Sequence, residues 1–250
     1  MQIVFDQPEI KFFRSLKYTN KSGIQNELSG VIALNERGKI DNVTVFFGDK
    51  MNSHLPFGAL TFHTHTLLPK TKQIADSSTD VPSPTDLVTI GMAILYNGAQ
   101  EHLVFTPTYV YTITWFKEAY ESLKNLSKTT SASAITDRLY NIMQGEYDKL
   151  ISKHGKNYGI SFINEWFDII RQIGFDIRKF NQGEDVVFVM GPVTSDTSLN
   201  SLIVISGDDK KYKKQYIVYK AIAATFIGVI VVASVWAIKR SKNKTNLSYK

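Results

Sequence analysis

The stretch that decides the fold is Ala59-Leu60-Thr61-Phe62-His63-Thr64-His65, together with Ser83-Pro84-Thr85-Asp86 at the head of the next apolar segment. β-Branched and aromatic residues make the first piece a candidate strand. In the second piece the serine suits an N-cap, the proline the first helical position and the aspartate the first turn. The sequence therefore predicts a strand, a long polar loop over residues 66–82, and a helix.

Other strand and helix signals surround this pair. Residues 31–34 and 43–47 are β-rich runs, and the polar stretch between them has the composition of a hairpin connection. Residues 103–105 and 109–115 return to strand character, and residues 116–126 favour a helix. We predict that residues 1–126 form the main domain.

A different composition begins after residue 126. Residues 127–134 are rich in serine and threonine and low in apolar content, so they are predicted to be a linker and a domain boundary. Residues 135–207 are expected to form an accessory, mainly helical region, with apolar stripes at helical spacing over 139–151 and 162–173. These stripes predict packing faces for the main domain or for a helical partner protein. Two short β-rich runs follow, at 186–190 and 202–205.

The segment 221–238 is an unbroken run of uncharged, mostly apolar residues that is long enough to span a bilayer. The N-terminal residues 1–6 lack a basic leader and do not resemble a signal peptide. We therefore predict a single-pass, tail-anchored protein whose N-terminal part lies in the cytosol, with residues 208–250 as the anchor region. A buried core helix is the alternative for 221–238.

The basic charge of the chain is concentrated at its C-terminal end. The net charge is +6, but residues 208–250 contain ten Lys/Arg and two Asp/Glu, which leaves 19 basic and 21 acidic groups in residues 1–207. This distribution predicts contact with anionic lipid headgroups and gives no electrostatic reason to expect nucleic-acid binding. The absence of cysteine excludes disulfides, thiolate nucleophiles and zinc sites built from cysteine.

The histidine pair has the spacing of a metal site. On a strand, side chains at i and i+2 point to the same face, so His63 and His65 can converge on one ion. Asp86 can complete a set of three ligands and leave one position open, which is the arrangement of a catalytic zinc site. Such an ion makes a water molecule nucleophilic at neutral pH. Glu27 is our candidate for the carboxylate that accepts and returns the water proton.

Each residue also has an ordinary explanation when it is considered alone. A His-x-His pair in a strand is commonly a surface or packing pair, and Glu27 alone would be a loop carboxylate. Ser83 and Asp86 are fully explained as helix cap and first-turn acid. The order and context of all five residues favour the metal site. Ordinary roles are predicted for the other histidines, His54, His102 and His154.

Taken together, Glu27-Leu28-Ser29-Gly30, His63-Thr64-His65 and Ser83-Pro84-Thr85-Asp86 resemble the JAMM motif of the MPN/JAB metalloprotease family. The resemblance covers residues 1–125 and implies an α/β domain, related to the cytidine deaminase architecture, that carries one zinc ion. It implies that the two histidines and Asp86 bind zinc, that Glu27 is the general acid/base, and that Ser83 helps to hold the tetrahedral oxyanion. The reaction it implies is hydrolysis of an isopeptide bond between a lysine and ubiquitin or a ubiquitin-like protein.

The chain departs from the family pattern between the second histidine and the serine. Seventeen residues separate His65 from Ser83, more than the motif usually has, and Thr66 stands where proline is common. Lengthening a surface loop costs little free energy, so the ligands are compatible with the insertion. We predict that residues 66–82 lie beside the metal and act as a lid or specificity loop.

The sequence thus predicts a membrane-anchored zinc metallopeptidase that cleaves isopeptide or peptide bonds in conjugates of ubiquitin or a ubiquitin-like protein. The second hypothesis is a non-catalytic, membrane-anchored interaction module of the MPN type. The third is a structural membrane protein whose His-x-His is incidental. Zinc content separates the third hypothesis from the other two, and activity separates the first from the second.

Overall fold

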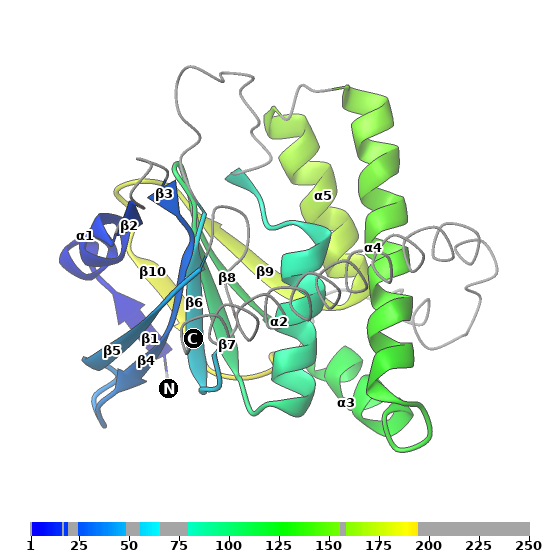
Figure 1. Cartoon of the computed structure of the whole chain (residues 1–250), viewed down its shortest axis with the longest axis horizontal. Coiled ribbons are helices and arrows are strands. Elements are labelled where there is room, and N and C mark those ends of the chain that lie inside the picture. Colours follow the sequence, from blue (N-terminus) through cyan, green and yellow to red (C-terminus); the bar gives the residue numbers. More distant parts are fainter. Residues whose placement is uncertain are drawn as a thin grey trace, which may run out of the picture. The chain divides into compact units, whose positions relative to one another are not determined.

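The computed structural model describes residues 2–16, 18–19, 25–48, 56–65, 80–155 and 159–194 (Figure 1). All of them belong to one compact unit, residues 1–208. The predicted β-rich run at 202–205 and the predicted membrane span at 221–238 lie outside the described residues. Within the described part, no helix combines the length and the apolar character that crossing a membrane requires.

A mixed six-stranded sheet forms the centre of this α/β fold. Its strands, in spatial order, are β5 (Ile40–Phe47), β4 (Leu28–Leu34), β6 (Leu60–Thr64), β7 (Glu101–Phe105), β8 (Val110–Trp115) and β9 (Phe175–Phe180). Neighbours in this sheet are antiparallel except β6 and β7, which run parallel. The crossover between these two contains α2 (Pro84–Tyr96), so they form a β-α-β unit.

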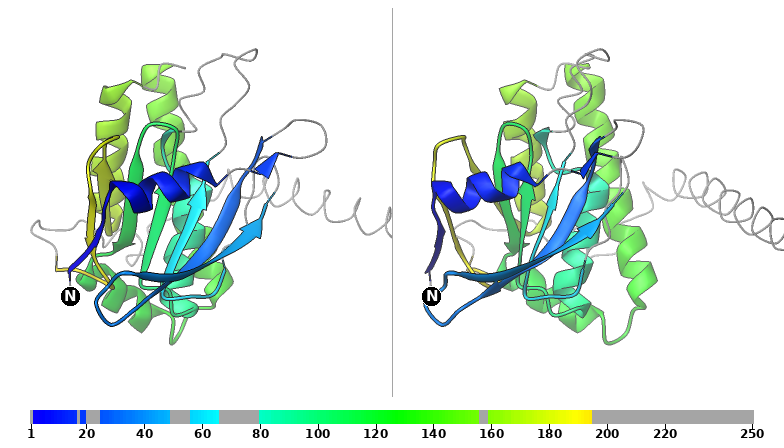
Figure 2. Two further views of the ribbon diagram at one scale, coloured as in Figure 1. Left: turned by 90° about the vertical axis from the view of Figure 1, so that its left-hand side faces the viewer. Right: turned by 60° about the vertical axis from the view of Figure 1, so that its left-hand side comes forward.

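The two faces of the sheet are covered by different elements (Figure 1, Figure 2). One face carries α2 and three further helices, α3 (Lys117–Leu126), α4 (Ala132–His154) and α5 (Ile160–Ile173). The other face carries α1 (Gln7–Ser15) and an antiparallel pair of strands, β1 (Gln2–Phe5) with β10 (Val186–Val189). A short antiparallel pair, β2 (Tyr18–Thr19) and β3 (Gln25–Asn26), precedes β4. The central strands β6, β7 and β8 are therefore buried on both faces, whereas the edge strand β5 is largely exposed.

An aromatic core fills the space between the sheet and α1. Phe13 of α1 lies with its ring centroid 4.8 Å from that of Phe105 and 5.0 Å from that of Phe62. The buried residues of this core come from both layers: Ile3, Phe5, Ile10, Phe13, Ile32, Leu60, Phe62, Leu103, Phe105, Val110, Val186 and Phe188. Because side chains alternate along a strand, Leu60 and Phe62 face this core while Thr61 and His63 face α2.

Close packing holds α2 against the other face. A Cβ atom added at Gly91 would lie 2.7 Å from Trp115 Cζ2 and 2.8 Å from Phe175 Cζ, so only glycine lets the helix come this near. Trp115 Nε1 also donates a hydrogen bond of 3.0 Å to the Gly91 carbonyl. These contacts at Gly91, in the middle of α2, therefore fix the position of the helix relative to β8 and β9.

Four further hydrogen bonds fix the chain just before α2. Trp166 of α5 donates from Nε1 to the Pro82 carbonyl at 3.0 Å, and the Tyr111 hydroxyl donates to the Asp80 carbonyl. The Asp80 carboxylate accepts from Thr108, from its backbone N–H at 3.0 Å and from its hydroxyl at 2.9 Å. The entry to α2 thus depends on β8 and α5 as well as on its own cap.

Most of the predicted elements of the first half are confirmed. The strands expected at 31–34, 43–47, 59–65, 103–105 and 109–115 are β4 to β8, and the helices expected after 83 and over 116–126 are α2 and α3. The predicted run at 186–190 is β10. The helix α1 and the strands β1, β2, β3 and β9 were not predicted.

The second half of the described chain joins the same sheets as the first half. Residues 127–131 connect α3 to α4, and α4 already begins at Ala132, within the stretch expected to be a linker. β9 pairs with β8, and β10 pairs with β1. The region 135–207 therefore contributes strands as well as two helices.

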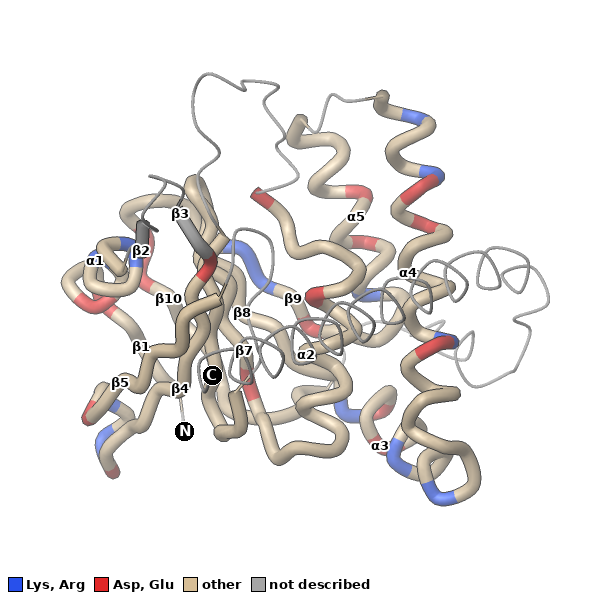
Figure 3. The backbone as a smooth tube through the Cα atoms, in the orientation of Figure 1, with Lys and Arg blue, Asp and Glu red and all other residues tan. Residues whose placement is uncertain are grey.

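The apolar stripes predicted on α4 and α5 are buried within the protein itself. The buried side chains of these stripes are Leu139, Ile142, Met143, Tyr147, Leu150, Phe162, Trp166, Ile170 and Ile173. They lie where α4 contacts α2 and α5, and where α5 contacts β9. Figure 3 shows acidic and basic residues interspersed along α3, α4 and α5. The helical layer thus has an apolar inner side and charges of both signs elsewhere.

A buried carboxyl group lies on the α1 side of the sheet. Glu101 of β7 is only 2% exposed, and its Oε2 atom has no hydrogen-bond partner among the described residues. Burial raises the pKa of Glu101 well above its usual range, and the nearby Asp176 raises it further, while Arg178 and the Thr112 hydroxyl act in the opposite direction. Arg178 itself is paired with Asp176, with Nη2 2.7 Å from Oδ2. The folded state therefore favours a protonated Glu101.

Glu101→Gln is expected to remove a loss of stability that the wild-type protein shows as the pH rises. The unfolded chain releases this proton near the ordinary glutamate pKa of about 4.3, whereas the folded chain releases it only at its raised pKa. The contribution of protonated Glu101 to stability is therefore fully present below about pH 4.3 and is lost as the pH rises toward and through the raised pKa of the folded chain. Glutamine has the shape of the neutral acid, so the variant should match wild type at pH 4 and exceed it by about 1–3 kcal/mol at high pH.

Denaturant unfolding at a series of pH values between 4 and 9 measures this effect. The exposed Glu36, in the turn between β4 and β5, supplies the matched control Glu36→Gln. The control should follow the wild-type curve at every pH. Parallel curves for wild type and Glu101→Gln would contradict the prediction.

Candidate metal centre

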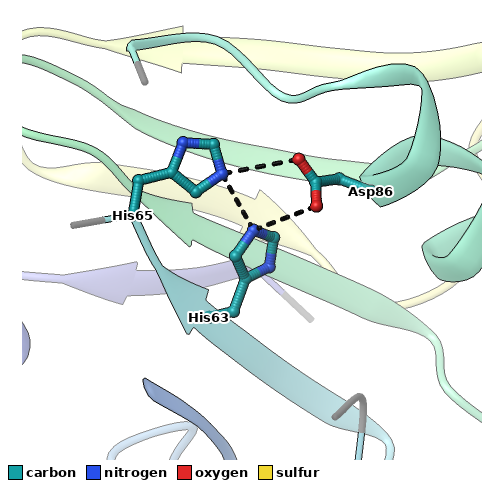
Figure 4. Close-up of side chains that lie close together, drawn as sticks. All are labelled: His63, His65 and Asp86. Atoms are coloured by element: carbon teal, nitrogen blue, oxygen red, sulfur yellow. Dashed lines mark hydrogen bonds and ion pairs between the residues drawn. The ribbon is translucent and has the colours of Figure 1, made fainter. Parts of the chain in front are cut away.

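Three predicted site residues meet where β6 ends and α2 begins (Figure 4). His63 lies in β6, His65 follows the last residue of that strand, and Asp86 lies in the first turn of α2. The backbone N–H of His65 donates to the Phe105 carbonyl at 2.8 Å, which continues the hydrogen bonding of β6 with β7. Figure 4 shows both imidazole rings and the carboxylate pointing toward one another. The parallel β-α-β unit brings the three side chains together.

The distances between these side chains suit a shared cation. The two Nε2 atoms are 3.1 Å apart, Asp86 Oδ1 lies 3.7 Å from His63 Nε2, and Oδ2 lies 3.5 Å from His65 Nε2. Ligands bound tetrahedrally at about 2.0–2.1 Å are separated by about 3.3 Å from one another. The group of His63, His65 and Asp86 could therefore hold a metal ion with small side-chain adjustments.

The two sides of the cluster differ in access to solvent. The side chains of His63 and His65 are 4% and 8% exposed, whereas that of Asp86 is 26% exposed. The rings are held between the sheet and α2, and the carboxylate borders the solvent. The side of the cluster that is open to solvent is therefore that of Asp86.

The protonation states favour cation binding. Burial lowers the pKa of His63 to about 4, against an opposing effect of Asp86, so this ring is neutral at neutral pH. For Asp86, burial opposes ionisation, but the hydrogen bond with His65, the electrostatic interaction with both imidazole rings and the backbone N–H of Ser83 together bring its pKa well below the usual range. Neutral imidazole and ionised carboxylate are the forms that bind metals.

Ser83 and Asp86 form a capping box at the start of α2. The backbone N–H of Asp86 donates to Ser83 Oγ at 3.1 Å, and the backbone N–H of Ser83 donates to Asp86 Oδ2 at 2.8 Å. The predicted cap is confirmed. It also orients the carboxylate, because the bond to Oδ2 limits rotation of the Asp86 side chain near the two rings. The structural role and the proposed metal-binding role of Asp86 are therefore compatible.

Glu27 lies immediately before β4, and its carbonyl accepts a hydrogen bond of 2.9 Å from the Gly48 N–H. The antiparallel register of β4 and β6 pairs Leu28 with Thr64 and Ser29 with His63. Continued by one residue, this register sets Glu27 opposite His65. Directly opposite residues share a face and have Cβ atoms about 4.5–5.5 Å apart. Glu27 is thus at the edge of the cluster and on its face of the sheet.

One histidine that sequence analysis assigned to an ordinary role contacts the cluster. His102 Nε2 lies 2.7 Å from His63 Nδ1, and His102 Nδ1 lies 2.7 Å from Thr61 Oγ1. No local sequence pattern links these residues, because the contact depends on the register of β6 with β7. His154 instead lies beside Glu165, with Nε2 3.2 Å from Oε1, and His54 is outside the described residues.

The fold and the cluster define an α/β protein with a His-His-Asp group that could hold a metal ion. Comparison of the chain with protein-family models, with curated proteins and with solved structures found no match.

Proposed function

We propose that this protein is a zinc-dependent hydrolase of isopeptide or peptide bonds. The observation that carries the proposal is the convergence of His63, His65 and Asp86 on one point beside α2. Two imidazoles and one carboxylate leave a fourth position open on a tetrahedral ion, as in catalytic zinc sites. The resemblance of the surrounding residues to the JAMM motif supports both the choice of metal and the type of reaction.

The proposed chemistry divides among four groups. Zinc, when bound, supplies a Lewis acid and a nucleophilic water at neutral pH. Glu27 accepts the proton of that water and returns it to the leaving amine. Ser83 Oγ already accepts the Asp86 N–H, so its own hydroxyl proton is available to donate to the tetrahedral oxyanion. His63, His65 and Asp86 would hold the ion.

We propose conjugates of ubiquitin or a ubiquitin-like protein as substrates, at the cytosolic surface of a membrane. The resemblance supports the substrate, and the apolar segment 221–238 with its basic flanks supports the location. A non-catalytic interaction module remains the alternative function. Its partner would have to use a surface other than the stripes of α4 and α5, because these are buried in the protein's own core.

Elemental analysis and a cleavage assay on the full chain test this proposal. The expected result is one zinc ion per chain and cleavage of ubiquitin chains or of a ubiquitin–lysine isopeptide. Removal of the metal with a chelator should abolish cleavage, and added zinc should restore it. Stoichiometric zinc without cleavage would favour the interaction module. A chain that binds no divalent ion would overturn the proposal.

A further inference from the structure

A buried line of three polar side chains leads into the metal centre from behind. It consists of Thr61, His102 and His63, which are 0%, 1% and 3% exposed. Thr61 Oγ1 lies 2.7 Å from His102 Nδ1, and His102 Nε2 lies 2.7 Å from His63 Nδ1. The line ends at His63 Nε2, the atom that faces His65 and Asp86. His63 Nδ1 and both ring nitrogens of His102 therefore each have one hydrogen-bond partner in this line.

The register of the parallel strands creates the line. β6 and β7 pair Thr61 with His102 and His63 with Val104. All of these side chains face α2, so His102 lies between the two residues of β6 on the neighbouring strand. The rings of His63 and His102 have centroids 5.0 Å apart and planes inclined by 33°. Neither ring can turn away without breaking a buried hydrogen bond.

When both rings are neutral, proton counting gives this line two arrangements. In the first, His63 Nδ1–H donates to His102 Nε2, and His102 Nδ1–H donates to the Thr61 hydroxyl oxygen. His63 Nε2 then carries a free lone pair. In the second, every bond is reversed, His63 Nε2 carries a proton, and that atom cannot bind a cation. The direction of the bond at Thr61 is thus coupled to the protonation of His63 Nε2, the nitrogen that faces the cluster.

We propose that His102 and Thr61 are positioning residues that hold His63 in the tautomer with its proton on Nδ1. This role rests on the proposed metal centre but not on hydrolysis. Metal-binding histidines commonly donate their second N–H to a neighbouring acceptor, which fixes the ring and the tautomer.

Thr61→Val tests the role at the far end of the line, two hydrogen bonds from the cluster. Valine keeps the shape of threonine but offers no acceptor, so the metal-binding arrangement would leave the buried His102 Nδ1–H without a partner. We expect zinc or cobalt affinity, measured by competition with a chelating dye on the full chain, to fall by about 10- to 100-fold. Thr61→Ser restores the hydroxyl and should restore the affinity.

Thr114→Val is the matched control. Thr114 is also buried, and its hydroxyl donates to the Gln100 carbonyl at 2.8 Å, on the opposite face of the sheet from the cluster. This variant should lose a comparable amount of stability and keep its metal affinity. His102→Gln, which offers an amide oxygen near the position of Nε2, should bind metal more tightly than His102→Leu. If Thr61→Val and Thr114→Val weakened metal binding equally, Thr61 would contribute only to packing, and the proposal would be overturned.

The tautomer itself can be read by long-range ¹H–¹⁵N NMR of the imidazole rings in the metal-free protein. We expect His63 to carry its proton on Nδ1 in wild type and in Thr61→Ser, and to lose this preference in Thr61→Val. A wild-type ring protonated on Nε2, or a tautomer that does not respond to Thr61→Val, would overturn the proposal. This measurement needs no bound ion, so it separates failure of the line from failure of the proposed zinc enzyme.

Discussion

Glu27→Gln is expected to keep one zinc ion per chain and to lose about 10²- to 10⁴-fold in the rate of bond cleavage. The amide has the shape of the carboxylate but cannot accept the proton of the attacking water, and general acid/base groups contribute rate factors of this size. The register of β4 and β6 supports the assignment, because it sets Glu27 opposite His65. Zinc content and the initial rate on a ubiquitin–lysine isopeptide are the two measurements.

The control for this variant is Glu36→Gln, on an exposed turn of the same β4–β5 hairpin. It should leave both measurements unchanged. Turnover that survives in Glu27→Gln would show that another group carries the proton. Loss of zinc in the same variant would instead identify Glu27 as a ligand, and the proposed division of roles would be wrong.

His63→Ala is expected to weaken zinc binding by about 100- to 1,000-fold. Zinc sites are worth about 10–16 kcal/mol in total, so removing one of four ligand positions costs roughly 3–4 kcal/mol. His63 is the most buried of the three residues, and its removal also takes away the partner of His102. Competition with a chelator measures the affinity, and thermal unfolding reports whether the variant still folds.

Asp86→Asn complements this test, because it does not create a cavity. The asparagine oxygen can still accept the Ser83 N–H, so the capping box survives while the charge is lost. His154→Ala removes a histidine outside the cluster and is the control for non-specific effects. Both cluster variants should lose zinc and the control should keep it. Tight zinc binding by both cluster variants would show that other residues bind the metal.

Local sequence signals predicted the elements that carry the cluster. The β-branched and aromatic composition of 59–65 and the capping residues at 83–86 act over short distances, and the structure confirms both elements. A similar local signal at Asp6, Pro8 and Glu9 was missed, although it forms a complete capping box at the start of α1. That helix was predictable, since its cap uses the same chemistry as the cap of α2.

Sheet membership was less accessible from the sequence. The serine- and threonine-rich stretch 127–134 has the composition of a linker, yet the residues after it return to the sheet as β9 and to β1 as β10. Pairing between strands distant in sequence depends on how the whole core packs, so local composition does not predict it. The contact of His102 with His63 was missed for the same reason, because only the register of β6 with β7 brings these rings together.

The fixed ends of the interval 66–79 have a consequence for how this protein could diversify. On one side His65 is held by its bond to Phe105, and on the other side Asp80 is held by Thr108 and Tyr111. Both anchors lie in the central sheet or in the loop between its strands β7 and β8, so neither depends on what the chain does in between. Insertions and deletions in this interval of the sequence would therefore leave His65 and the chain before α2 held by the same contacts. The length and composition of this interval could then change in evolution while the positions of His65 and Asp86 are retained.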